Sequence, residues 1–405
     1  MRRTSAPARA GLLIGALTAT LAIVPTAPAG AAERREASAW DVTPAARITI
    51  TGQGYGHGHG MSQYGAEGAA RQGLTYQQIA EFYYAGTQWG IAAGRVTVQL
   101  TVDSTPSDLV VRARSGLTLR DSKVRGRTPL PENGATAWRV VTGRSGVGQV
   151  SYLTDQWYPY TTLQGTGEFF AAGRPVTLVT PSGDRAYRGR LRTALTSSGA
   201  RATVNELRLE KYLRGVVPLE MPASWSTEAV RAQAVAARTY AAYERAHPRS
   251  SAYPICDTTS CQVYGGVAAE HPAASLAIRD TRTQILTSDG EPAFTQFGSS
   301  SGGWTSAGSV PYLAAREDPY DGWAGNPVHE WKVVLTDTRL EQAWPKVGDL
   351  SRIDVTSRDG NGTWGGRVGS ITLAGTGGQV TVSGDTFRSV LGLRSTWLTF
   401  TISPG

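Results

Sequence analysis

Glu220 is the residue whose surroundings most directly indicate acid and base chemistry. It stands in the segment GVVPLEMP (residues 215–222), where apolar side chains and two prolines flank the carboxyl group. Partial desolvation raises the pKa of a carboxyl group, so Glu220 would hold a proton near neutral pH, as a general acid must. The start of the following helix would act in the opposite direction, because its dipole favours the anion. Glu220 is therefore interpreted as a catalytic acid or as a cap of that helix.

Cys256 and Cys261 are the only cysteines, and both lie in the segment ICDTTSC. In an exported chain, a disulfide that closes this short loop is the simplest interpretation. His247 lies upstream, however, and one imidazole with two thiolates would make three ligands of a zinc site with an open fourth position. The residues alone leave both alternatives open.

Ser300 lies in GSSSG (residues 298–302), which matches the G-x-S-x-G pattern of serine hydrolases. That pattern requires a strand before the serine and a helix after it. The preceding PAFTQF is typical of a strand, but the following GGWTSAGSVPY is a poor start for a helix. We therefore interpret this glycine and serine loop as backbone that approaches a ligand.

Glycine occupies every second position in TGQGYGHGHGM (residues 51–61). In an extended strand, alternate residues face the same side, so this segment would have one bare face and one face carrying larger side chains such as His57. Glycine weakens a strand, so the bare face indicates a close approach by another backbone or by a ligand.

Two helices with recognisable caps are predicted after this glycine run. Ser62 can cap a helix that runs through Arg71. Thr75 and Gln78 have the spacing of a capping box, so a second helix should run to about Tyr84. The glycine strand should thus lead into a helical hairpin.

The rest of the chain indicates an α+β fold with one long central helix. Short alternating segments from Gly94 to about Asn205 are typical of antiparallel β structure in a sandwich or barrel-like unit. Ser226 can cap a long helix over residues 227–246, which Pro248 ends. Further strand segments follow toward the C-terminus.

The N-terminus has the features of a secretory signal. Arginines precede an apolar stretch, and small residues follow it, so cleavage is expected near Ala31. Residues 32–46 lack periodicity and are interpreted as a tether. We expect a secreted protein with no transmembrane anchor after signal cleavage, because no later run reaches the roughly 18 apolar residues of a span.

The formal net charge is +8, and three of the arginines belong to the signal. The remaining excess suits an anionic surface such as the cell wall. Export disfavours nucleic acid as a partner.

These motifs together resemble a known family. LEKYLRGVVPLEMPASW, AQAVAARTYA, CDTTSCQVYGG, SSSGGWTS and GYGHGHGMSQYGA are similar to the SpoIID/LytB (stage II sporulation protein D) family of cell-wall proteins. In the usual order of that family, the GHG-x-GMSQ-x-GA element follows the last strand, whereas here it occupies residues 54–66. We infer a circular permutation, in which the N-terminal strand and two helices dock at the active-site groove.

The resemblance implies a peptidoglycan lytic transglycosylase, which cleaves MurNAc-GlcNAc bonds and leaves 1,6-anhydroMurNAc ends. Glu220 matches the catalytic glutamate of the E-M-P motif. The alternative is a non-catalytic, peptidoglycan-binding enhancer of a wall amidase. Hydrolysis by water would require a second carboxylate facing Glu220, with Asp257, Asp318 and Asp321 as candidates.

The resemblance also implies a zinc ion held by His247, Cys256 and Cys261, with the Cys256–Cys261 disulfide as the alternative. His57 is a substitute zinc ligand or a groove histidine. The residues assigned to substrate binding are His57, Gln233, Arg238, Tyr264, Ser300 and Ser301. The predicted division is a signal peptide (1–31), a linker (32–46), the permuted element (47–93), a β-rich subdomain (94–205) and a SpoIID-like catalytic core (206–403).

Overall fold

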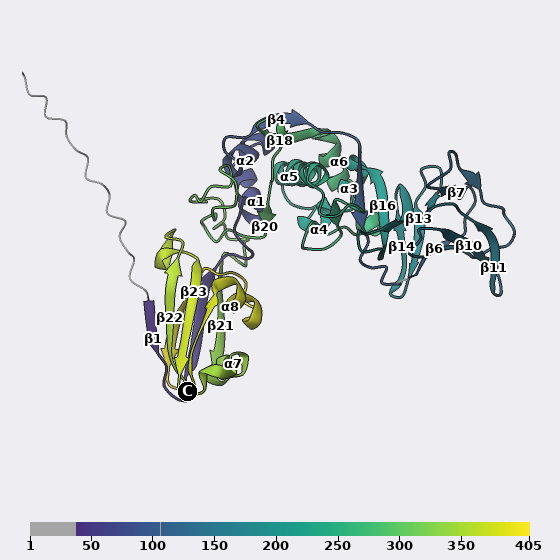
Figure 1. Ribbon diagram of the computed structural model, residues 1–405. Coiled ribbons are helices and arrows are strands. Elements are labelled where there is room, and N and C mark those ends of the chain that lie inside the picture. Colours follow the sequence, from purple (N-terminus) through teal and green to yellow (C-terminus); the bar gives the residue numbers. More distant parts are fainter. Residues whose placement is uncertain (1–37, 106) are drawn as a thin grey trace, which may run out of the picture. The chain divides into compact units, whose positions relative to one another are not determined.

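A computed structural model describes residues 38–105 and 107–405. The predicted signal segment, residues 1–31, and the first part of the predicted linker lie outside the described residues. The fold is α+β and mostly β, which confirms the predicted class (Figure 1). In the part of the chain that the structure describes, no helix is both long and apolar enough to cross a membrane.

The long helix α5 (Thr227–Ala246) confirms the predicted central helix. Most of its alanines are buried, so other helices can approach it closely. The helices that contact it are α1 (Gln63–Arg71), α2 (Tyr76–Tyr83), α3 (Leu209–Leu213), α4 (Val217–Glu220) and α6 (Pro272–Asp280).

The caps of α1 and α2 are those that the sequence predicts. Ser62 Oγ accepts a hydrogen bond from Gly65 N at 2.9 Å and caps α1. Thr75 and Gln78 form a reciprocal capping box at the start of α2. Because Ser62 is the cap, Gln63 stands at the first position of α1.

From Gly54 on, the glycine run is a loop, and the prediction of a regular strand there was wrong. β2 (Arg47–Gln53) includes Gly52 and ends before Gly54, and Gly54 and the three alternate glycines that follow have positive φ, from 68° to 104°. An extended strand requires negative φ. The predicted close approach of another backbone is confirmed, because a Cβ on Gly54 would lie 2.8 Å from the Ser300 carbonyl oxygen.

Two sheets, almost entirely antiparallel, contain the predicted β segments between Gly94 and Asn205. The seven-stranded sheet has the order β17 (Ile255–Cys256), β5 (Arg95–Gln99), β16 (Arg201–Arg208), β15 (Arg190–Leu195), β12 (Gly167–Phe170), β7 (Thr118–Asp121) and β8 (Thr128–Pro129). The six-stranded sheet has the order β11 (Trp157–Thr162), β10 (Gly148–Leu153), β9 (Ala137–Thr142), β6 (Asp108–Arg112), β13 (Val176–Thr180) and β14 (Gly183–Tyr187).

Strands from the two ends of the described chain pair with each other. β2 lies between β21 (Glu330–Thr336) and β25 (Leu398–Ser403) and is antiparallel to both. β1 (Ser38–Asp41) pairs with β22 (Leu350–Arg358), so the prediction of a tether was wrong for these four residues. The Trp40 ring packs edge-on against Phe400, with 5.0 Å between centroids, and anchors this strand.

The remaining elements are short or lie near the C-terminus. The strands are β3 (Met61–Ser62), β4 (Gln88–Ile91), β18 (Gln284–Ser288), β19 (Glu291–Pro292), β20 (Phe297–Gly298), β23 (Val368–Gly375) and β24 (Gly378–Ser383). The helices are α7 (Asp337–Ala343), α8 (Gly384–Leu391) and the 3-10 turns η1 (Gly266–Ala269), η2 (Pro345–Val347) and η3 (Thr363–Gly365). The division of residues 47–403 into three parts stays a proposal.

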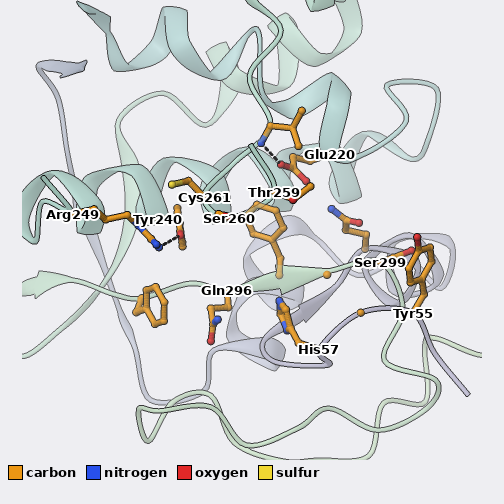
Figure 2. A pocket seen from close by; sticks show the side chains of 16 residues that line it. Tyr55, His57, Glu220, Tyr240, Arg249, Thr259, Ser260, Cys261, Gln296 and Ser299 are labelled. Atoms are coloured by element: carbon orange, nitrogen blue, oxygen red, sulfur yellow. Dashed lines mark hydrogen bonds between the residues drawn. The ribbon is translucent and has the colours of Figure 1, made fainter. Parts of the chain in front are cut away.

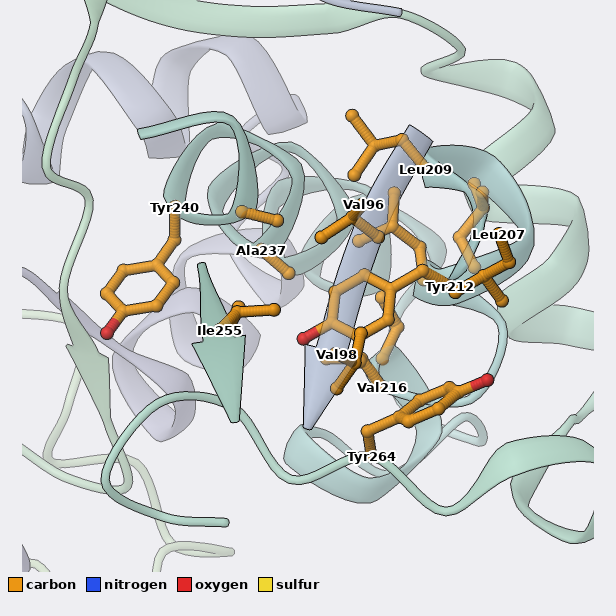
Figure 3. Packing of buried hydrophobic residues seen from close by; sticks show 14 of the residues in the cluster. Val96, Val98, Leu207, Leu209, Tyr212, Val216, Ala237, Tyr240, Ile255 and Tyr264 are labelled. Carbon is orange, nitrogen blue, oxygen red and sulfur yellow. The ribbon is translucent and has the colours of Figure 1, made fainter. Parts of the chain in front are cut away.

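A hydrophobic core fixes the chain on both sides of Glu220 (Figure 3). The side chains of β5, α3 and α5 meet there, and Tyr212 and Tyr264 pack with ring centroids 5.0 Å apart. Val216 and Val217 are completely buried directly before the segment that ends at Glu220. The short helix α4 is therefore anchored at its start, which holds its last residue in place.

Candidate functional site

A groove of about 380 Å³ brings Glu220 and His57 together (Figure 2). Glu220 stands at the end of α4, and His57 comes from the glycine loop. Residues 259–263 and 294–299 supply the other walls, together with Tyr240 and other single side chains. The two polar residues that the sequence placed at one site thus line one groove.

The Glu220 carboxyl group is partly buried at the groove wall. Burial raises its pKa, while the Val263 backbone N–H and the Gln63 side chain oppose the rise by hydrogen bonding. The Val263 N–H donates to Oε1 at 3.0 Å. The sequence predicted this raised pKa, and the structure places Glu220 at the end of α4, with Pro218 in its first turn. Glu220 can therefore hold a proton closer to neutral pH than an exposed glutamate can.

His57 presents an uncharged imidazole to the same groove. Its Nδ1 accepts a hydrogen bond from the His59 backbone N–H at 2.9 Å, which leaves the ring proton on Nε2. Burial, followed by the charges of His59, Arg367 and Arg388, lowers the pKa of His57 to about 4. At neutral pH, His57 is thus a neutral hydrogen-bonding group.

Residues 197–288 match the SpoIID family, described as a stage II sporulation protein, and this range contains Glu220 and both cysteines. The chain thus contains a SpoIID domain over these residues. The glycine loop precedes the matched range and residues 294–299 follow it, so one wall of the groove comes from each side of that range.

Several relatives share part of their length with this chain. The amidase enhancer of Bacillus subtilis (strain 168) is 38% identical over 135 residues, which is 32% of this chain and 17% of that protein. The stage II sporulation protein D of the same strain is 30% identical over 224 residues, or 48% and 60% of the two lengths. That of Bacillus amyloliquefaciens is 33% identical over 143 residues, or 29% and 41%. The chain thus covers less than two thirds of each relative.

Gln63, Tyr240 and Arg249 line the groove, although the sequence analysis did not select them. Arg249 donates to both carboxylate oxygens of Glu244 at 2.6 and 2.8 Å, and to the Tyr240 hydroxyl at 3.0 Å. A signal for Gln63 was available, because it directly follows the helix cap in the quoted GMSQYGA motif. No comparable local signal marks the other two.

Ser300 and Ser301 belong to a buried set of polar residues that we call the serine–aspartate cluster, and they do not line the groove. Ser300 Oγ donates to Asp321 Oδ2 at 2.7 Å, and Ser301 Oγ donates to Asp318 Oδ2 at 2.8 Å. His329 Nδ1 lies 2.9 Å from Asp321 Oδ2. The members of the serine–aspartate cluster are Ser62, Tyr83, Ser300, Ser301, Asp318, Asp321, Asn326 and His329.

This arrangement does not support a serine hydrolase. Ser300 donates its proton to a carboxylate, and the chain after it forms no helix, in contrast to a nucleophile elbow. The cluster joins the start of α1 to the loop after β20, because Ser62 Oγ also donates to Asp321 Oδ1 at 2.6 Å. The cluster therefore holds these two segments together and has a structural role.

Gln233, Arg238 and Tyr264 are buried in the SpoIID domain and do not line the groove. Arg238 donates from Nε and Nη2 to the Glu210 carboxylate at 2.9 and 3.0 Å. The Tyr264 hydroxyl donates to Asn205 Oδ1 at 2.8 Å. These three residues were predicted to bind the sugar. In the structure, their side chains are buried away from the groove.

The residues of the predicted zinc site do not fit a zinc ion in this structure. Cys256 and Cys261 form a disulfide with their Cα atoms 5.5 Å apart, so neither sulfur is a thiolate. The His247 ring stacks on Tyr243, and its Nδ1 lies 3.1 Å from the Tyr243 carbonyl oxygen. Among the described residues, no group of three or more His, Cys, Asp or Glu residues is arranged to hold a metal. The disulfide is the alternative that the sequence left open, and zinc binding by the reduced chain stays a prediction.

Proposed function

We propose that this SpoIID chain is a lytic transglycosylase of peptidoglycan, with Glu220 as its single acid and base. One observation carries the proposal. Among the described residues that line the groove, Glu220 is the only carboxylate, and burial raises its pKa. A lone carboxyl group suits a reaction in which the substrate supplies its own nucleophile.

The other candidate carboxylates are engaged away from the groove. Asp257 accepts hydrogen bonds from the Thr101 backbone N–H at 3.0 and 3.1 Å. Asp318 and Asp321 lie in the serine–aspartate cluster. Ordinary glycosidases use a second carboxylate to activate water or to form a covalent intermediate. The absence of one from the described lining favours transglycosylation over hydrolysis.

The proposed reaction uses one carboxyl group twice. Glu220 donates its proton to the glycosidic oxygen while the bond from that oxygen to C1 of MurNAc breaks, and the acetamido group of the sugar can assist. The C6 hydroxyl oxygen of the same sugar then bonds to C1, and the Glu220 carboxylate takes the hydroxyl proton. The product is a 1,6-anhydro sugar, no water is consumed, and Glu220 is protonated again.

Three neighbours have roles that follow from their contacts. The Val263 N–H and the Gln63 side chain stabilise the Glu220 carboxylate between the two steps, because both hydrogen bonds favour the anion. The neutral His57 can donate from Nε2 to a sugar oxygen. His57 and Gln63 both come from the N-terminal element, which supports its docking at the groove and is consistent with a circular permutation.

The relatives favour action outside the cytoplasm, at the cell wall. We propose that the predicted signal directs export, and that peptidoglycan glycan strands are the substrate. A second candidate function has its own support, because a relative with 38% identity is named an amidase enhancer. In that case, the groove binds glycan without cleaving it, and a wall amidase is the partner.

Mass spectrometry of reaction products tests the proposal. The mature protein is incubated with purified peptidoglycan, native and stripped of peptides, beside Glu220→Gln and a matched control, Glu132→Gln, at an exposed loop position. We expect anhydro-muramyl products from the wild type and the control, and none from Glu220→Gln. Reducing ends would indicate hydrolysis. No cleavage, combined with faster release of peptides by an added wall amidase, would favour the enhancer.

A further inference from the structure

A second pocket, of about 330 Å³, lies away from the groove and has a strongly basic lining. Its lining residues come from the segment that enters β5, from the start of α3 and from the turn after α6. In the described chain, it shares no lining residue with the groove. The basic lining residues are Arg95, Arg208 and Arg282.

The one carboxylate in the lining, Glu210, already has its charge compensated. Arg238 is completely buried and donates to both of its oxygens, and the Thr283 N–H donates to Oε1 at 3.1 Å. These bonds neutralise Glu210 from the interior side of the pocket. The positive charge of the three arginines is therefore not balanced by the lining itself.

Two of the arginines face each other directly. Arg95 and Arg208 are opposite residues in the antiparallel ladder of β5 and β16, and like charges at such positions are destabilising. The carboxylate nearest to Arg95 is that of Glu206 at 3.8 Å, which also pairs with Arg190 at 3.3 Å. Within the described residues, Arg208 and Arg282 form no ion pair. An anion bound in the pocket would remove this repulsion.

The pocket is also formed before any ligand binds. The Leu209 N–H donates to the Gly94 carbonyl at 3.0 Å, and the Ala92 N–H donates to the Thr283 carbonyl at 2.8 Å. Arg245 of α5 donates to the carbonyl of residue 93 at 2.7 Å and adds a fourth positive charge nearby. The three lining segments are thus held together, which reduces the entropy lost on binding.

An exposed apolar side chain lies two residues before the first lining residue of this pocket. Ile91 is 82% exposed, and it directly precedes Ala92, which bonds to the turn that carries Arg282. Trp89, at the alternate position of β4, is 37% exposed. Tryptophan and aliphatic side chains beside arginines are typical of surfaces that rest on a membrane interface.

We propose that the three-arginine pocket and Ile91 form a peripheral contact with an anionic phospholipid surface. The pocket receives the phosphate of a lipid headgroup, for which guanidinium groups are well suited, and Ile91 enters the interface beside it. A soluble phosphate polymer would fill the pocket but would gain nothing from Ile91. This proposal goes beyond the proposed function and does not depend on it.

Co-sedimentation with lipid vesicles tests the proposal. The mature protein is mixed with vesicles of phosphatidylcholine alone or with about 30 mol% phosphatidylglycerol, and short poly(glycerol phosphate) is added as a competitor. The variants are Arg208→Gln/Arg282→Gln, Ile91→Ser and a charge-matched control, Arg144→Gln/Arg174→Gln, at exposed positions. Circular dichroism and Tm establish that each variant is folded.

We expect binding only to the anionic vesicles, with an affinity that falls as salt rises. The pocket double variant should lose roughly 25-fold, because each arginine near such a surface contributes about fivefold, and the control should bind like the wild type. Ile91→Ser should lose roughly fivefold. Equal binding by the pocket variant and the control, or binding to neither vesicle, would overturn the proposal. Arginine-dependent binding to the polymer without binding to vesicles would overturn the membrane assignment and assign the pocket to a wall polymer.

Discussion

The groove and the serine–aspartate cluster both contain carboxyl groups that are shielded from water, but the hydrogen bonding of these groups differs. Asp321 accepts hydrogen bonds at both oxygens, including those from Ser62, Ser300 and the Ser301 N–H. Burial tends to raise its pKa, but these bonds and His329 lower the pKa below its usual value. Glu220 has only two such partners, and burial prevails, so its pKa is raised.

The comparison shows that a raised pKa alone does not identify a catalytic acid. Burial, and then the charge of Asp321, raises the pKa of Asp318 to about 7, yet Asp318 accepts hydrogen bonds from Tyr83, Ser301 and the Tyr320 backbone N–H, away from the groove. Glu220 differs because it lines a groove that a substrate can enter. Access to solvent, together with an incomplete set of hydrogen bonds, separates the candidate acid from the structural ones.

The largest effect is expected from Glu220→Gln, which removes the proton but keeps the shape of the side chain. Cleavage of peptidoglycan should slow by about 10²–10⁴-fold, the usual contribution of a general acid. The Tm should not fall, because the substitution removes a buried ionisable group. Product release and thermal unfolding are measured on the same preparation. A Tm loss as large as that of a cluster variant would assign Glu220 a structural role.

Asp321→Ala should affect stability instead. It leaves the hydroxyl groups of Ser62 and Ser300 and the His329 ring without their acceptor, and the loss of one partner from a buried charged network costs about 3–5 kcal/mol. We expect Tm to fall by about 5–10 °C. Asp155→Ala, at an exposed position, is the control and should leave Tm unchanged. An unchanged Tm in Asp321→Ala would show that the cluster does not stabilise the fold.

Much of the local structure could be predicted because its causes are local. The capping box of α2 depends on Thr75 and Gln78, which lie within one helical turn. Pro248 follows the end of α5 as predicted, whereas Ser226 stands at the N-cap position without a side-chain capping hydrogen bond and donates to Glu67 instead. For the glycine run, the close approach of another backbone could be predicted but the backbone conformation could not, because alternating glycine suits both a strand and a loop of positive φ.

The contacts that complete the site are not local. Gln63 reaches Glu220, and Ser300 reaches Asp321, only after distant segments have packed together. Arg238 was assigned to substrate binding, but it binds the carboxylate of Glu210 in the same chain. A motif shows that a polar residue has a partner, but it does not show whether that partner is the substrate or the protein itself.

Gln63→Ala should have a smaller effect than Glu220→Gln and should act through Glu220. Cleavage should slow by roughly tenfold, the effect of losing one hydrogen bond to a charged group. The Gln63 side chain lowers the pKa of Glu220, so its loss should move the alkaline limb of the pH–rate profile to higher pH. Gln72→Ala, at the exposed end of the same helix, is the matched control. An unshifted profile would exclude a positioning role.

The smallest effect concerns the pH dependence of stability. Asp318 has a pKa of about 7 in the folded chain against 3.8 as its ordinary value, so its stabilising contribution is complete below pH 3.8 and is lost as pH rises through 7. The raised pKa of His329 acts in the same direction above its ordinary value of 6.5. Wild-type Tm should therefore fall between pH 5 and 8. Asp318→Asn cannot ionise and should reduce this fall by about 2–3 °C, leaving the share of His329. An unchanged dependence of Tm on pH in Asp318→Asn would mean that Asp318 keeps the same charge across this range. The cluster and the groove would then differ only in whether a substrate can reach the carboxyl group.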